Sequence, residues 1–187
     1  MKNMQFLFIT AIFSAFFTSG FGQGPIDNPG EQVYQSCCGA EPVIFNSGNA
    51  YMFVPNVFTP NSDGVNDYFI PSFNEYILGF DSYLIYTLED NHVVFASAGF
   101  DPNNAQNTAW DGLNKDGSVY TGAFKYQFTA FLKEGGLIKI EGKACRIVCG
   151  PDAKVFETKT GCFYPAQVDS TGHLDQSIPN KETGCFN

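Results

Sequence analysis

The sequence predicts an all-β fold, a β-sandwich of short antiparallel strands. Residues 124–132 alternate between apolar and polar side chains, which is typical of a strand with one buried face. Gly, Pro, Asn and Asp interrupt the chain roughly every 8–12 residues, as they do in sandwiches. No segment repeats its apolar residues at helical spacing, so no long helix is expected.

Apolar runs between turn residues define the individual strands. The last two are expected to form a hairpin around Gly135 and Gly136. Asp90 and Asn91 are expected to turn the strand at 83–88 back into the one that follows it. The full set of expected strands is 42–45, 51–58, 67–70, 83–88, 92–96, 124–132 and 137–141.

Aromatic residues supply most of the expected core, since the chain has 20 Phe and 9 Tyr. The buried face of the strand at 124–132 is expected to carry Phe124, Tyr126 and Phe128 inward. Trp110 is the single Trp and is expected to fill the core between the sheets. The alternative for Trp110 is an exposed platform on which a sugar stacks.

The first 22 residues have the layout of a secretory signal peptide. Lys2 precedes the apolar stretch at 6–17, and small residues follow at Ser19, Gly20 and Gly22. A short apolar stretch between a positive residue and small residues is the signal-peptide pattern. We place cleavage near Gly22, and an uncleaved N-terminal anchor is the alternative.

Three regions follow the leader. Residues 23–50 are expected to be an N-terminal tail with Cys37, Cys38 and a candidate first strand. Residues 51–149 form the sandwich, and 150–187 form a cysteine-containing C-terminal tail. No segment of the mature chain reaches the roughly 18 apolar residues of a transmembrane helix. The expected location is therefore secreted or on the outer cell surface.

The charge balance disfavours some partners. The chain has 10 basic and 19 acidic residues, a formal net charge of −9. Such a surface repels phosphate backbones and anionic lipids, so no nucleic-acid partner is expected.

Six cysteines in an exported chain predict disulfides, because the compartment beyond the inner membrane is oxidising. The expected bonds join the first two cysteines to the next two in either order, and the last two to each other: Cys37 and Cys38 with Cys145 and Cys149, and Cys162 with Cys185. A zinc site is the competing hypothesis. It has little support, because there is no CxxC pair and the two His residues are isolated.

Residues 58–67, FTPNSDGVND, concentrate oxygen-bearing side chains in a short loop. The candidate ligands of a structural calcium ion are Asn61, Asp63, Asn66 and Asp67, since calcium prefers carboxylate, amide and carbonyl oxygens. Gly64 comes too early for an EF-hand. Asx residues also bond their own backbone amides in turns, so a metal-free turn is the alternative.

A second loop, WDGLNKDG, offers a weaker metal candidate. Its oxygen-bearing residues are Asp111, Asn114 and Asp116. A turn that joins two strands needs residues of this kind without any metal, and that is the favoured interpretation.

Catalysis is not expected. The hydroxyls near a His are Ser170 and Thr171 beside His173, in a tail without a scaffold to hold catalytic geometry. A carboxylate pair for glycoside hydrolysis stays open, because its spacing is set in space and not along the chain.

Two motifs resemble a known family. FTPNSDGVND at 58–67 and AWDGLNKDGSVYTGAFKYQF at 109–128 resemble the gliding motility-associated C-terminal domain, the type B sorting domain of the type IX secretion system in Bacteroidota. The resemblance covers about residues 54–141. It implies an immunoglobulin-like β-sandwich that crosses the outer membrane and is then released or held at the cell surface. It also strengthens the calcium hypothesis for the first loop.

These observations give two hypotheses for function. The first is a non-enzymatic exported module for gliding, adhesion or secretion, whose partner is the type IX machinery or another cell-surface protein. The alternative is a calcium-stabilised carbohydrate-binding module for polysaccharide. Sugar binding needs at least two flat side chains on one face. The candidates are Tyr76, Tyr83, Tyr120 and Trp110.

Overall fold

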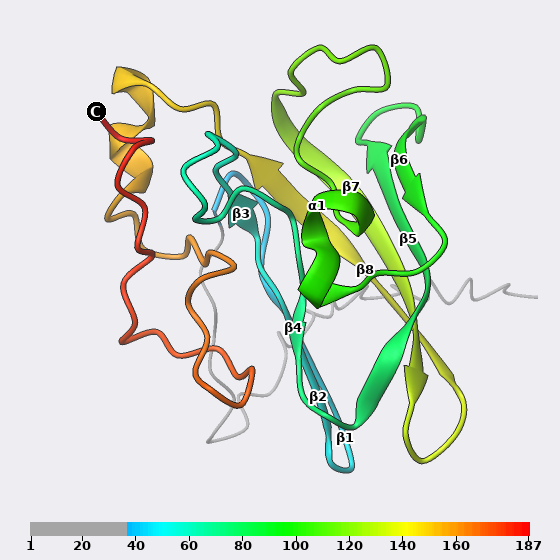
Figure 1. Ribbon diagram of the computed structural model, residues 1–187. Coiled ribbons are helices and arrows are strands. Elements are labelled where there is room, and N and C mark those ends of the chain that lie inside the picture. Colours follow the sequence, from blue (N-terminus) through cyan, green and yellow to red (C-terminus); the bar gives the residue numbers. More distant parts are fainter. Residues whose placement is uncertain (1–36) are drawn as a thin grey trace, which may run out of the picture. The chain divides into compact units, whose positions relative to one another are not determined.

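The computed structural model describes residues 37–187, so the expected signal peptide at 1–22 lies outside the described residues. Within this range the chain forms two β-sheets and very little helix (Figure 1), which confirms the all-β prediction. The first sheet has the order β1-β2-β4, with β1 at Val43–Ser47, β2 at Ala50–Val54 and β4 at Ser72–Phe73. The second has the order β3-β8-β7-β5-β6, with β3 at Val57–Phe58, β5 at Ile77–Thr87, β6 at Val93–Ser97, β7 at Gly122–Leu132 and β8 at Leu137–Arg146.

Helical structure in the described part of the chain is confined to connections. Two 3₁₀ segments are η1 at Pro102–Asn104 and η2 at Pro151–Phe156. A single α-helical turn, α1, covers Ala105–Thr108 between β6 and β7. None of these segments is long enough to need the helical apolar spacing that the sequence lacks.

Both expected hairpins are present. β7 and β8 pair antiparallel with Phe128 opposite Ile140, and Gly135 and Gly136 in their turn both have φ of 95°. Positive φ of this size is open to glycine and strained for other residues. β5 and β6 pair antiparallel around Asn91, which has φ of 55°. The period-two pattern and the turn residues therefore located both hairpins, although β5 begins at Ile77, before the expected 83, and β8 continues to Arg146, beyond the expected 141.

The expected single strand at 51–58 is wrong. The chain changes sheets at Pro55, so that β2 belongs to the first sheet and β3 to the second. Proline has no amide hydrogen for a ladder, which explains the break. β3 also runs parallel to β8, with Val57 opposite Cys145, and so departs from the antiparallel pairing that was expected.

The expected strand at 67–70 is also absent as a regular element. It is reduced to one bridge, in which the Phe69 amide donates to the Trp110 carbonyl at 2.9 Å. β4 follows instead, and its two residues pair with β2. A two-residue strand carries too little periodicity to be recognised in a sequence.

One aromatic core receives side chains from both sheets. Trp110, Phe124, Tyr126 and Phe128 are all buried in it. Rings meet edge to face, as Trp110 and Phe124 do with centroids 4.8 Å apart. Such pairs add to the stabilisation that burial gives. The first sheet contributes Ala50, Met52 and Val54, and the second contributes Phe58, Tyr83, Ile85, Ile140 and Ala144.

The C-terminal tail covers the other face of β2. Tyr51 and Phe53 point away from the main core and form a small buried cluster with Phe163. β2 is the central strand of the first sheet and is covered on both faces, so all five of its residues are buried. The tail at 150–187 has few regular elements, yet it packs as part of the folded body (Figure 1).

Candidate functional site

The loop at 58–67 is organised around the carboxylate of Asp67. One of its oxygens accepts hydrogen bonds from the amides of Asn61, at 2.9 Å, and Ser62, at 2.6 Å. The other accepts from the amide of Gly64 at 2.7 Å. The loop is thus wrapped around an acceptor from its own chain, which is the chemistry of an Asx turn.

The remaining candidate calcium ligands also have protein donors. The Asp63 amide donates to Asn61 Oδ1 at 3.1 Å, and the Val65 amide donates to Asp63 Oδ1 at 2.9 Å. Asn66 Oδ1 accepts from the amide of Ala166 in the tail at 3.0 Å. These contacts are those of the metal-free turn. The metal-free turn therefore accounts for all four residues as they are placed, and the calcium site stays a prediction.

Sequence reasoning missed Glu182, which joins the tail to this loop. Its side chain is buried, with 7% of the residue exposed. The carboxylate accepts from the Thr59 hydroxyl at 2.6 Å and from Asn61 Nδ2 at 2.9 Å. Within residues 37–187 it forms no ion pair. No signal in the sequence marked this residue, because its partners lie more than a hundred positions away.

Asp63 lies beside Glu182 on the exposed side of this contact. Asn61 Nδ2 donates to Asp63 Oδ2 at 3.1 Å as well as to Glu182. Burial raises the pKa of Asp63, but hydrogen bonds from the Val65 amide and the Asn61 side chain outweigh it and leave that pKa below its ordinary value of 3.8. The ionised form is therefore the one that the loop stabilises.

The second candidate loop is also held by its own hydrogen bonds. Asp111 accepts from the Leu113 amide at 3.0 Å. Asp116 accepts from the amide and the hydroxyl of Ser118, at 2.9 and 2.6 Å, and Asn114 donates to the same hydroxyl. The structure thus uses these three residues to shape the turn. Within residues 37–187, no group of three or more His, Cys, Asp or Glu is arranged to hold a metal ion.

Arg146 borders a pocket of about 530 Å³ between the two loops. It is 6% exposed, and its Nε and Nη1 have no hydrogen-bond partner among the described residues. Gly112 has φ of 82°, and a Cβ there would overlap the Arg146 side chain, which explains the glycine of the WDG motif. Burial lowers the pKa of Arg146, and Asp111 opposes that shift. Asp67 and Asp111 border the same pocket and would repel an anion, so we assign no ligand to it.

The aromatic candidates for sugar binding are not assembled into a platform. Trp110 and Tyr83 are buried, and Tyr120 packs edge to face on Trp110 with centroids 5.4 Å apart. Tyr76 precedes β5 and lies near Lys133, at the far end of β7 from Tyr120. These four residues therefore do not offer two flat rings on one face.

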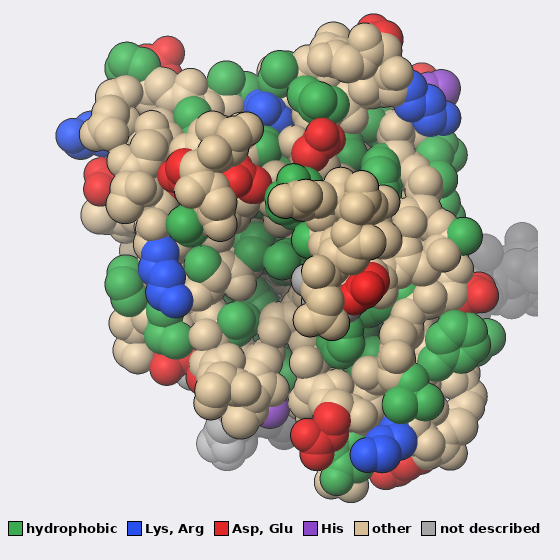
Figure 2. Space-filling model, in the orientation of Figure 1, with side chains coloured by type: hydrophobic (Ala, Val, Ile, Leu, Met, Phe, Trp, Pro, Cys, Tyr) green, Lys and Arg blue, Asp and Glu red, His purple; other side chains and the backbone are tan. Residues whose placement is uncertain are grey.

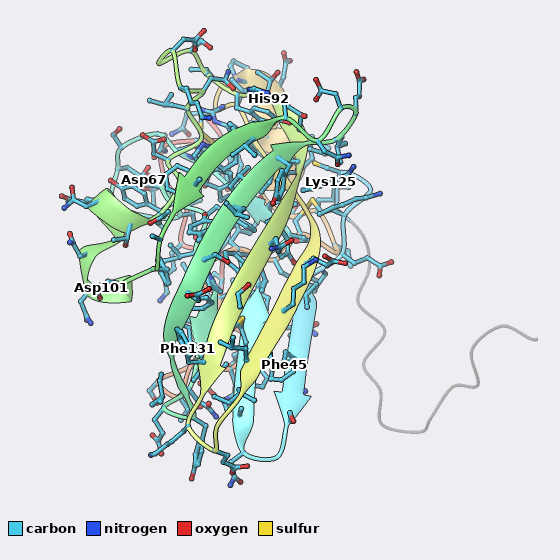
Figure 3. The ribbon with its side chains drawn as sticks, turned by 90° about the vertical axis from the view of Figure 1, so that its right-hand side faces the viewer. Phe45, Asp67, His92, Asp101, Lys125 and Phe131 are labelled. Atoms are coloured by element: carbon cyan, nitrogen blue, oxygen red, sulfur yellow. A yellow bond between two sulfur atoms is a disulfide. The ribbon has the colours of Figure 1, made fainter. Side chains whose placement is uncertain are left out.

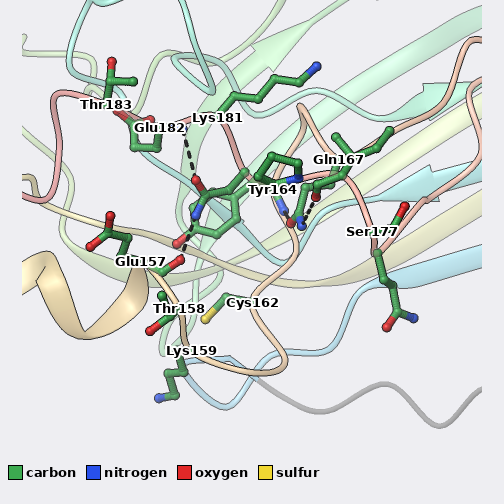
Figure 4. Close-up of a pocket in the computed structure, with 14 residues that line it drawn as sticks. Glu157, Thr158, Lys159, Cys162, Tyr164, Gln167, Ser177, Lys181, Glu182 and Thr183 are labelled. Atoms are coloured by element: carbon green, nitrogen blue, oxygen red, sulfur yellow. Dashed lines mark hydrogen bonds between the residues drawn. The ribbon is translucent and has the colours of Figure 1, made fainter.

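A pocket of about 500 Å³ lies within the C-terminal tail (Figure 4). Its polar groups bond one another: Gln167 Oε1 accepts from the Tyr164 amide, and Gln167 Nε2 donates to the Ile178 carbonyl, both at 2.9 Å. The Tyr164 hydroxyl donates to the Phe156 carbonyl at 2.9 Å. These bonds hold the coils of the tail together.

Thr171 and His173 in the tail lie close together, but their hydrogen bonds connect the groups in a different order from those of a catalytic triad. Asp169 accepts from the hydroxyl of Thr171 at 2.7 Å, and that oxygen lies 2.8 Å from His173 Nδ1. In a triad the carboxylate bonds the imidazole and not the nucleophile. Here Asp169 also accepts the amides of Thr171 and His173, which is the bonding of a turn.

The disulfides differ from the expected pairing. Cys37 is bonded to Cys162, with Cα atoms 4.9 Å apart, and Cys149 is bonded to Cys185, with Cα atoms 4.4 Å apart. The expected bond between Cys162 and Cys185 is therefore wrong, as are both expected partners of Cys37. The tail folds back between the N-terminal turn and the end of β8, which spacing along the chain does not reveal.

The sequence matches no protein-family model, and no curated protein is significantly similar to it. No helix among the described residues is long and apolar enough to cross a membrane. The two disulfides are compatible with an extracellular protein.

Proposed function

We propose that the protein is a non-enzymatic exported module, built on an immunoglobulin-like sandwich of the type IX sorting kind, that acts at the cell surface by binding another surface protein. The docking of the C-terminal tail on the loop at 58–67 carries this proposal. Glu182 and Asn66 connect the two segments, and the Cys149–Cys185 disulfide secures the end of the tail. The loop that carries the sorting-like motif thus serves as the docking site of the C-terminal tail.

A C-terminal tail held by disulfides suits a protein that functions outside the cell. The tail buries few apolar residues for its length, so its order depends on cross-links and on polar contacts with the body. Such cross-links persist in an oxidising compartment and are reduced in the cytosol. The resemblance to a sorting domain supports the type IX route for export.

The binding face that we propose is the free side of the second sheet, near the turn between β7 and β8. Phe131 and Leu137 face each other across the two strands, and they are 41% and 58% exposed. Leu78 in the adjacent strand is 65% exposed. Figure 3 shows Phe131 at the opposite end of this sheet from Lys125 and His92. Exposed apolar groups gathered in this way favour a protein surface as the partner.

The distribution of charged side chains does not mark an alternative binding face. Acidic and basic side chains are interspersed on the side of the molecule that Figure 2 shows. Within residues 37–187, the single ion pair joins Lys139 and Glu141 on the surface. The carbohydrate-binding alternative requires paired aromatic rings, and no observation favours it over the interaction module.

Retention on cells tests this binding face. Leu137→Glu places a charge in the proposed contact, and Val155→Glu is the matched control, because Val155 is 63% exposed on η2. We expect the Leu137 variant to move from the cell-bound fraction into the medium, while the Val155 variant distributes like the wild type. Equal retention of both variants, with unchanged melting temperatures, would exclude this face.

A further inference from the structure

All six cysteines lie in or against one apolar cluster beside η2. The cluster also contains Val57, Ile147 and Tyr164. Four of its cysteines are bonded, and two remain as thiols: Cys38, which is half-buried, and Cys145, which is buried.

Cys38 occupies a backbone conformation that residues with a Cβ seldom adopt. Cys37 and Ala40 exchange two backbone hydrogen bonds, of 2.7 and 2.9 Å, and so close a tight turn. The two residues between them, Cys38 and Gly39, have φ of 54° and 71°. A two-residue turn with positive φ at both positions favours Asn and Gly. Such a conformation persists where the surroundings fix it.

Asn56 fixes this turn against the strand that carries Cys145. Its side-chain amide donates to the Ala40 carbonyl at 2.9 Å and to the Gly161 carbonyl at 2.7 Å. Its backbone carbonyl accepts from the Cys145 amide at 2.8 Å. Asn56 is fully buried. One residue therefore holds the segments of both free cysteines in register.

The two thiols are in direct contact and have different acidities. They form a hydrogen bond with each other, which lowers the pKa of Cys38 and raises the pKa of Cys145. The charge of Lys159 adds to the lowering at Cys38 and partly opposes the rise at Cys145. Cys38 is thus the more exposed and more acidic thiol, as expected of the one that reacts first.

We propose that Cys38 and Cys145 form a third disulfide in the mature protein, which closes the cysteine cluster. The Cys38 thiolate attacks one sulfur of an external disulfide oxidant, such as oxidised glutathione, and expels a thiolate. Cys145 then loses its proton and attacks Cys38 Sγ, and the second thiolate leaves. The two cysteines lose two electrons and two protons, and the oxidant becomes two thiols.

Peptide mapping of purified protein, oxidised with glutathione and alkylated in denaturant without reduction, tests this bond independently of export. Trypsin leaves Cys145 in the short peptide 144–146, whereas Cys37 and Cys38 stay together in one long peptide that ends at Lys115. We expect a disulfide to link the 144–146 peptide to this long peptide. The peptide that contains Cys162 should be linked to the same long peptide through Cys37. Alkylated Cys145, or its linkage to Cys149 or Cys185, would overturn the proposal.

A variant that preserves the turn supplies the second measurement. Cys38→Asn keeps a residue suited to positive φ, so the turn is expected to fold. The oxidised variant should have one thiol that reacts after denaturation, and mapping should place it at Cys145. The variant's five cysteines leave one without a partner in the chain, so if mapping finds a cysteine other than Cys145 alkylated or bound to glutathione, Cys145 pairs elsewhere and the proposal fails.

Discussion

The carboxylate of Glu182 accepts a hydrogen bond of 2.6 Å from the hydroxyl of Thr59, although 123 positions separate the two residues. The same carboxylate accepts from Asn61, so it closes the tail over the loop that carries the sorting-like motif. Hydrogen bonds to a buried charge are stronger than neutral ones, and leaving their donors unpaired is unfavourable.

Truncation of this carboxylate is expected to destabilise the protein. Glu182→Ala should lower the free energy of unfolding by about 2 kcal/mol, because the Thr59 and Asn61 donors lose their acceptor. Urea denaturation measures the change. The control is Glu157→Ala, an exposed position in the same tail, which should stay within about 0.5 kcal/mol of the wild type. Equal losses in both variants would show that Glu182 has no special role.

Two core tyrosines are expected to respond oppositely to loss of the hydroxyl. The buried Tyr126 hydroxyl has no partner among the described residues, so Tyr126→Phe should leave stability unchanged or raise it by about 1 kcal/mol. The Tyr83 hydroxyl donates to the Phe69 carbonyl at 2.5 Å, so Tyr83→Phe should lower stability by about 1–2 kcal/mol. Thermal and urea unfolding of the pair check this, and a loss at Tyr126 would reveal a missed partner.

Acid is expected to loosen the loops before it unfolds the core. In Asp90, Asp116, Asp169 and Asp175, hydrogen bonds from nearby Thr or Ser side chains lower the pKa below 3.8. Asp63 has a lowered pKa as well. A lowered folded-state pKa gives stability that is present above 3.8 and is lost as the pH falls through the folded value.

Hydrogen exchange across an acid titration measures this effect. Amides that donate to these carboxylates, such as those of Val65 and Ser118, should lose protection below about pH 4, while β7 and β8 stay protected. Loop amides that kept their protection to pH 2 would contradict this account of the turns.

Calcium is expected to have little effect on stability. The oxygens of Asp67 already accept three backbone amides, and Asn66 Oδ1 accepts the Ala166 amide. Melting curves in calcium and in EDTA should therefore coincide. A higher melting temperature in calcium that disappears in Asp63→Ala would restore the calcium site that the sequence suggested.

Local features of the fold could be predicted from the sequence, and contacts between distant segments could not. The alternation of Phe124, Tyr126 and Phe128 with polar residues is a local signal, and the β7–β8 hairpin follows from it. The change of sheets at Pro55 was missed, because apolar residues continue on both sides of the short interruption at Pro55 and Asn56.

In the candidate site, too, local features could be predicted from the sequence and contacts between distant segments could not. Asp63 and Asp67 shape the turn that was one of the two alternatives, since the backbone amides that donate to them lie within six positions. The hydrogen bond between Glu182 and Thr59 and the disulfide between Cys37 and Cys162 depend on where the C-terminal tail folds back onto the body of the protein. That path is set by three-dimensional packing around Asn56, and spacing along the chain does not encode it.

Surface proteolysis of intact cells tests the central claim most directly. The full chain would be produced in a member of the Bacteroidota with an intact type IX machinery and in a matched strain without it. We predict that external protease, under reducing conditions, degrades the protein on intact cells or in the medium only when the machinery is present, and that otherwise the protein remains protected inside the cell. Equal exposure in both strains, or protection in both, would contradict the proposed export and surface role.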